Sequence, residues 1–257
     1  MNAWWNLVKK EYRMERNLVA VLLGMLIIGG LWAMFYNRDS LGIIMAPASM
    51  LLITATFVPA ILMLKSINGE VKQTPHLWLH CPYPAWMLLS AKLVVAMAAM
   101  LAVLAVDALF VYLTIVFISE EIGVSTGNLV LFATEVGSYL GLAIIGLSIY
   151  MAAWSSLVVV ATASVRSIFG RFNWLAGLGI FFLATWGVGK FHHTWFYDRL
   201  TKWGAFKINL ITADQVLPAA QHIGAMEIYA GQIILPLIVS MAVFALSAWL
   251  LDNKVEV

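Results

Sequence analysis

Charged residues and cysteines are scarce in this chain of 257 residues. Asp, Glu, Lys and Arg make up only 11% of the sequence, whereas a soluble domain carries roughly 25%. The one cysteine, Cys81, has no partner within the chain, which excludes an intramolecular disulfide. We expect it to behave as a small apolar residue. The net charge is +2, which indicates no nucleic-acid partner.

Catalytic and nucleotide-binding motifs are missing as well. The sequence contains no G-x-x-x-x-G-K-[ST] phosphate loop, no H-E-x-x-H, no G-x-S-x-G and no C-x-x-C. His192 and His193 are adjacent and therefore do not share a helical face, and His222 is the only other histidine nearby, so we expect no metal site. The sequence predicts a protein that is not an enzyme by itself, with no catalytic residues and no cofactor of its own.

Apolar residues are present in great excess. Hydrophobic residues make up 63% of the chain and the mean hydropathy is +0.91. Six apolar stretches are each long enough to cross a bilayer, because about 20 helical residues span ~30 Å of hydrocarbon. We therefore predict an all-α, polytopic membrane protein in which residues 1–257 form a single transmembrane domain of six helices. The stretches cover residues 18–36, 43–64, 93–118, 129–163, 174–191 and 231–251.

The positions of Lys and Arg predict the orientation. Six spans place both termini on one side, together with residues 65–92 and 164–173. Ten of the 15 basic residues lie on that side and five on the other, so the positive-inside rule makes it cytoplasmic. The ten are Lys9, Lys10, Arg13, Arg16, Lys65, Lys72, Lys92, Arg166, Arg171 and Lys254, and the five are Arg38, Lys190, Arg199, Lys202 and Lys207.

The segment before the first span is amphipathic. On a helical wheel of residues 2–16, a basic sector lies opposite an apolar sector. Paired tryptophans favour the headgroup zone, so we expect residues 1–17 to form an interfacial helix along the cytoplasmic membrane surface. A basic flank that only sets orientation is the alternative. The basic sector holds Lys9, Lys10, Arg13 and Arg16, and the apolar sector holds Trp4, Trp5, Leu7, Val8 and Tyr12.

One carboxylate, Asp107, lies near the centre of the third span. An ionised carboxylate costs ~3 kcal/mol there on insertion scales, so Asp107 is expected to face the bundle interior with a partner or to be protonated. Two readings stay open. Asp107 lines a translocation path, or it is an interhelical hydrogen-bonding group.

Two segments between spans are not expected to be free loops. The cytoplasmic segment 65–92 combines three prolines with a short amphipathic piece around Trp78, so we expect a docked loop helix. The outer segment 192–230 is long and rich in aromatic residues. We expect it to form short helices that lie at, or dip into, the outer leaflet.

The order of these parts resembles the permease subunits of type-2 ATP-binding-cassette exporters. The resemblance covers nearly the whole chain, and its most specific part is the loop after the second span. In the family an acidic residue, a leucine-rich short helix, a proline and a lysine follow one another there. Here they correspond to Glu70, to Leu77 and Leu79, to Pro82, and to Lys92. After the proline this chain departs from the usual serine and basic residue.

The resemblance implies that the loop from Glu70 to Trp86 contains a coupling helix that inserts into a separate ATPase subunit. Two such ATPases, which bind ATP and Mg, and a second permease copy or a homologous permease would complete the complex. The cargo would be a hydrophobic or peptide-antibiotic compound for export. The closing DNKVEV is similar to the tails of small bacterial permeases, which implies a bacterial plasma membrane. The coupling residues would be Glu70, Leu77, Trp78, Leu79, Pro82 and Trp86.

Two other functions stay open from the sequence. The first is a non-transporting membrane sensor or an immunity or assembly module, whose aromatic outer segment binds a ligand or partner. The second is an ion-coupled carrier with Asp107 as its proton site, although clear inverted repeats are missing.

Overall fold

The computed structural model describes residues 2–36, 41–73, 83–122, 125–165, 173–208 and 226–254. These residues are almost entirely helical, as the sequence predicts. The helices are α1 (Asn2–Tyr36), α2 (Leu41–Gln73), α4 (Ala85–Ile122), α5 (Thr126–Ser164), α7 (Asn173–His192), α8 (Trp195–Thr201) and α10 (Ala230–Lys254), and two short strands are β1 (Ala205–Ile208) and β2 (Met226–Tyr229).

Among the described residues, five helices are long and apolar enough to cross a membrane. They are α1, α2, α4, α5 and α10, which agrees with a helical, multi-pass membrane protein. The remaining expected span, 174–191, coincides with α7, a helix of 20 residues. Membrane crossing by α7 stays a prediction.

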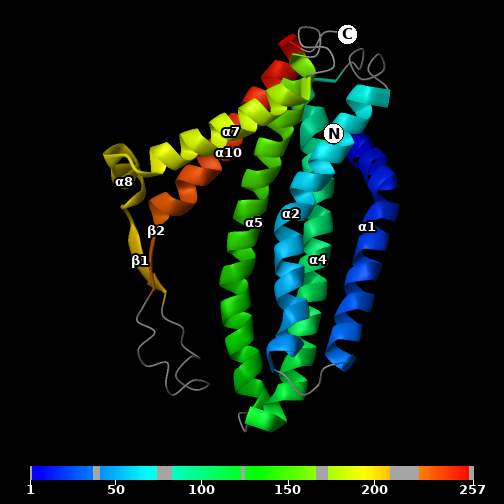
Figure 1. The fold of residues 1–257 in the computed structure, drawn as a ribbon, viewed down its shortest axis with the longest axis vertical. Coiled ribbons are helices and arrows are strands. Elements are labelled where there is room, and N and C mark those ends of the chain that lie inside the picture. The colour runs from blue at the N-terminus through cyan, green and yellow to red at the C-terminus, as the bar shows by residue number, and fades with distance from the viewer. Residues whose placement is uncertain are drawn as a thin grey trace.

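The four helices α1, α2, α4 and α5 run alongside one another, and α2 packs against both α4 and α5 (Figure 1). Both α2 and α4 are apolar around most of their circumference, which suits helices that have neighbours on several sides. Small residues such as Ala55 and Ala96 are almost fully buried and let the helix backbones approach closely. The largest fully buried apolar side chains of these two helices are Leu51, Met63, Ile67, Leu89, Met100 and Val103.

Helix α10 packs on α5 through its C-terminal half. The Ser156 hydroxyl donates a hydrogen bond to Ser247 Oγ at 3.2 Å, and both serines are fully buried. In Figure 1, α7 and α10 run obliquely to the other four helices and lead to α8 and the two strands. The start of α1 and the end of α10 lie at the same end of the bundle (Figure 1).

Residues 2–16 are the first turns of α1, which continues into the first span as one helix of 35 residues. Part of their apolar sector meets protein, since Val8 packs with Ala91 and Val95 of α4, whereas Trp5 and Tyr12 are exposed. The Trp4 indole donates a hydrogen bond to Ser90 Oγ at 3.1 Å. Residues 2–17, which the sequence predicts to lie along the membrane surface, are therefore continuous with the first span in this structure.

The described part of the outer segment contains one short helix and a small sheet. It holds α8 and the antiparallel pair β1–β2, with Ala205 opposite Tyr229 and Ile208 opposite Met226. The short helix α8 agrees with the expectation for this segment, whereas the strand pair was not expected. Both strands have the alternating, aromatic and β-branched composition that favours a strand, and Gly204 adopts φ 66 at the turn into β1. Residues 209–225 lie outside the described residues.

Candidate functional site: a buried ion cluster

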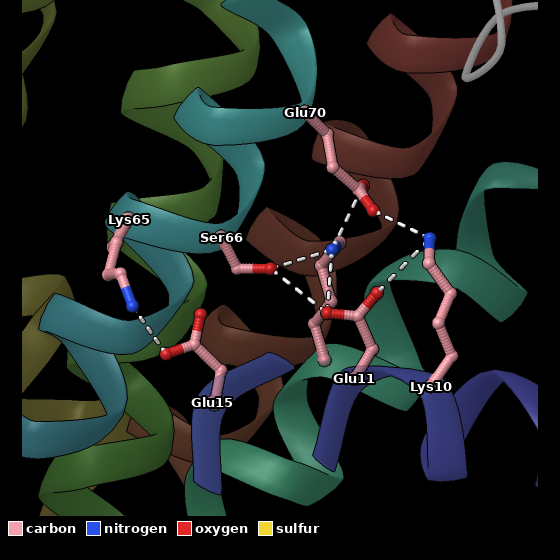
Figure 2. Close-up of polar contacts among 7 residues, drawn as sticks. Lys10, Glu11, Glu15, Lys65, Ser66 and Glu70 are labelled. Atoms are coloured by element: carbon pink, nitrogen blue, oxygen red, sulfur yellow. Dashed lines mark hydrogen bonds and ion pairs between the residues drawn. The ribbon is translucent and has the colours of Figure 1, made fainter. Parts of the chain in front are cut away.

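Six charged side chains and one serine meet where the start of α1 crosses the end of α2 and the start of α4 (Figure 2). The helical period brings them together, because residues four apart share a face. Thus Glu11 and Glu15 face the bundle from α1, and Ser66 and Glu70 face it from α2. The cluster consists of Lys10, Glu11, Glu15, Lys65, Ser66, Glu70 and Lys92.

Lys92 of α4 occupies the centre of the cluster, and only 2% of its side chain is exposed. Its Nζ lies 3.0 Å from Glu11 Oε2 and 2.9 Å from Glu70 Oε2, and it donates a hydrogen bond to Ser66 Oγ at 2.7 Å. An ammonium group has three protons to donate, and three oxygens surround it here. The Lys92 ammonium group therefore links α4 to both α1 and α2.

Two further contacts close the cluster. The Ser66 hydroxyl donates to Glu11 Oε2 at 3.1 Å, and Lys10 Nζ donates to Glu70 Oε1 at 3.0 Å. Lys10 and Lys92 carry two positive charges when ionised, and Glu11 and Glu70 carry two negative charges, so the four groups sum to zero. This balance matters because a buried charge without a partner costs several kcal/mol.

A separate ion pair lies one turn further along α1, toward its C-terminal end. Lys65 Nζ donates to Glu15 Oε2 at 2.8 Å, with Glu15 buried and Lys65 half exposed. This pair is a further contact between α1 and α2.

The structure places the predicted coupling residues in different surroundings. Glu70 is buried within the cluster, where both carboxylate oxygens contact lysines, so its side chain faces the helices and not the surface. Trp86 is 57% exposed in the first turn of α4. The other four, Leu77, Trp78, Leu79 and Pro82, lie outside the described residues.

The start of α4 also contacts the last helix. The backbone N–H of Ala85 donates a hydrogen bond to Asp252 Oδ1 of α10 at 3.1 Å. The segment that carries Trp86 is therefore tied to the C-terminal end of α10.

Asp107 lies far from the cluster. It is fifteen positions beyond Lys92 on α4, which is about 22 Å along the helix axis at 1.5 Å per residue. Its side chain is buried, and its Oδ1 has no hydrogen-bond partner among the residues that the structure describes. The structure thus confirms that Asp107 faces the interior, and it leaves both readings of Asp107 open.

The predicted basic sector of residues 2–16 is divided. Lys10 joins the ion cluster, whereas Lys9, Arg13 and Arg16 are exposed on the outer side of α1. The two tryptophans also differ, since Trp4 contacts α4 and Trp5 is exposed.

Sequence reasoning missed the roles of Glu11, Glu15, Lys65 and Ser66. A signal for two of them exists in the sequence. Glu11 and Glu15 fall in the same sector of the helical wheel as Trp4 and Val8, and a carboxylate within an apolar sector indicates a buried partner. Which lysine pairs with each glutamate could not be deduced from the wheel.

Comparison of the chain with protein-family models, with curated proteins and with solved structures found no match.

Proposed function

We propose that this protein is the transmembrane permease subunit of an ATP-binding-cassette exporter, driven by separate ATPase subunits. One observation carries the proposal. Glu70 and Lys92, the acidic residue and the lysine that border the cytoplasmic loop in the family resemblance, meet at 2.9 Å. The coupling helix is expected in the loop from Glu70 to Trp86, so Glu70 and Lys92 lie on either side of it in the sequence.

The ion cluster gives such a loop a mechanical connection to the spans. Lys92 holds the end of α2 and the start of α4 together, and through Glu11 it adds α1. Separating a buried ion pair leaves uncompensated charge, which costs several kcal/mol. A force applied to the loop would therefore move the three helices together and not pull one helix away from the others.

The last helix shares this connection through the Ala85–Asp252 hydrogen bond. Because α10 packs on α5 through Ser156 and Ser247, displacement at the loop would reach α5 as well. In the proposed mechanism, nucleotide closure of two ATPase subunits moves two such loops. Closure favours one of two access states, which is a population shift by a ligand with different affinity for each.

The proposal includes the surroundings of the protein. Both termini and the ion cluster lie on the cytoplasmic side of a bacterial plasma membrane, and a second permease copy or a homologous permease completes the path. The partner ATPases bind ATP and Mg. The cargo is a hydrophobic or peptide-antibiotic compound, in keeping with an apolar bundle.

Copurification tests this function. The chain, isolated with its native neighbours in mild detergent, is expected to bring a cassette ATPase in near-equal amount, measured by mass spectrometry. Replacing residues 77–86 with a Gly/Ser linker should release the ATPase. Replacing ten residues of the outer segment, 209–218, is the matched control and should retain it. Reproducible absence of any ATPase, or its retention after replacement of 77–86, would count against the permease.

The second candidate is a non-transporting sensor or an immunity or assembly module. The observation that favours it is the exposed aromatic surface of the outer segment, where Trp195 is 69% and Trp203 50% exposed. The Arg199 guanidinium lies 5.3 Å from the centre of the Trp195 ring. This function needs no ATPase, so activity in a host that lacks the ATPase would favour the sensor or module over the permease.

A further inference from the structure

The first turns of α1 have a second face whose side chains are exposed in the part of the chain that the structure describes. Trp4, Val8, Glu11 and Glu15 point into the bundle, and the residues on the opposite side are exposed. These residues are spaced by four, three, one and three positions, so they form one continuous stripe along the helix. We call them the outer stripe, which consists of Trp5, Lys9, Tyr12, Arg13 and Arg16.

The outer stripe carries three positive charges without compensation from the described residues. No described carboxylate forms a salt bridge with Lys9, Arg13 or Arg16. The two glutamates of the same turns are buried on the other face, where lysines already neutralise them. The charges on the inner face of this segment therefore sum to zero with their partners in the ion cluster, whereas the outer stripe carries a charge of +3.

The outer stripe continues directly into the membrane-facing surface of α1. Ile27 and Leu31 lie on the same side of the helix at 100° per residue and are 38% and 39% exposed, which is expected of side chains that face lipid. Leu18 is the first residue of the first predicted span. Arg16 lies roughly 3 Å and Arg13 roughly 8 Å before it along the helix axis, at 1.5 Å per residue. The polar layer on each side of the hydrocarbon is about 5–8 Å thick. The two arginines are thus at the depth of the lipid headgroups.

We propose that the outer stripe binds anionic phospholipid headgroups of the cytoplasmic leaflet. Arg13 and Arg16 donate hydrogen bonds to the lipid phosphate, since a guanidinium matches phosphate oxygens with paired donors. Lys9 lies further out along the helix and adds charge, and Tyr12 lies at the edge of the interfacial zone that favours its amphipathic ring. This site goes beyond the proposed function, because it depends on the membrane and not on an ATPase.

A lipid fits the outer stripe better than a protein partner does. Arg13 and Arg16 are at headgroup depth, and they share a helix face with the exposed apolar side chains of Ile27 and Leu31. Indole and phenol rings beside Lys and Arg are the usual composition of a membrane–water boundary.

The test uses the full-length protein alone in detergent, titrated with phosphatidylglycerol or with phosphatidylcholine and followed by native mass spectrometry. The triple variant Lys9→Gln/Arg13→Gln/Arg16→Gln is expected to bind phosphatidylglycerol roughly 100-fold more weakly, since each of the three cations near an anionic surface contributes ~1 kcal/mol. Binding of phosphatidylcholine should change little. Raising the salt concentration should reduce the difference between wild type and variant.

A matched control removes three cations from the predicted outer side of the protein. Lys190→Gln/Arg199→Gln/Lys202→Gln produces the same change in net charge at exposed positions. It should retain most of the phosphatidylglycerol affinity. The conservative variant Arg13→Lys/Arg16→Lys keeps the charge and should also retain most of it. All substituted side chains are exposed, so the thermal unfolding temperature should stay within a few degrees of wild type.

Two results would overturn the proposal. Equal phosphatidylglycerol affinity in the two triple variants would show that the outer stripe is not the site. Undiminished lipid affinity, combined with loss of a copurifying ATPase from the Lys9/Arg13/Arg16 variant, would assign the outer stripe to a protein partner. Because the lipid titration contains no ATPase, its failure is distinct from failure of the permease proposal.

Discussion

Substitution of Lys92 tests the ion cluster most directly. Lys92→Met keeps an unbranched side chain of similar length and removes the ammonium group that touches Glu11, Glu70 and Ser66. The remaining charges are then Lys10 at +1 against two carboxylates at −2, an excess of −1. Removing one partner of a buried pair costs about 3–5 kcal/mol, so we expect a loss of this size in the free energy of unfolding.

The matched control is Lys10→Met. Lys10 contacts the same two glutamates, at 3.0 and 3.8 Å, but its side chain is 54% exposed. Exposed ion pairs contribute about 0–1 kcal/mol because water screens them, so this variant should lose no more than that. Both losses are measured by reversible unfolding in mixed SDS micelles, followed by tryptophan fluorescence.

A double variant separates charge balance from packing. Lys92→Met/Glu11→Gln leaves Lys10 at +1 and Glu70 at −1, which restores a sum of zero. It should be more stable than Lys92→Met alone. If Lys92→Met costs no more than Lys10→Met, or if the double variant is the least stable of all, the reasoning about buried charge is wrong.

Three further outcomes are expected. A Cβ atom at Gly30 would lie 2.6 Å from the Phe110 ring, so Gly30→Ala should cost about 1–3 kcal/mol of unfolding free energy, whereas Gly29→Ala has open space and should cost nothing; equal losses would contradict the α1–α4 packing. Asp107→Asn should leave stability unchanged or improve it in the same assay, since one buried oxygen of Asp107 has no described partner; a loss above ~1 kcal/mol would indicate an ionised partner. Cys81 should react with a membrane-impermeant thiol reagent only after the cells are permeabilised, whereas a cysteine placed in the outer segment should react at once; labelling of Cys81 in intact cells would reverse the predicted orientation.

The sequence was a reliable guide to the helices because bilayer thickness and backbone hydrogen bonding leave few alternatives. Long apolar stretches must be helical in lipid, and five of the six expected spans fall in helices that are long and apolar enough to cross it. Local chemistry also indicated that Asp107 faces the interior. The strands at 205–208 and 226–229 were missed because four-residue alternation is a weak signal beside a run of aromatic residues.

The pairings within the ion cluster depended on tertiary structure alone. Lys92 lies 26 positions from Ser66, and the Lys65–Glu15 and Lys10–Glu70 contacts span 50 and 60 positions. A helical wheel assigns each of these residues to a face of its own helix, but it contains no information about which helices are neighbours or how far each is shifted along its axis. The amino-acid sequence by itself determined where charge is scarce and which faces are apolar, since these follow from local composition and period. Only the packing of α1, α2 and α4 decided which charges neutralise one another inside and which remain on the outer face of α1.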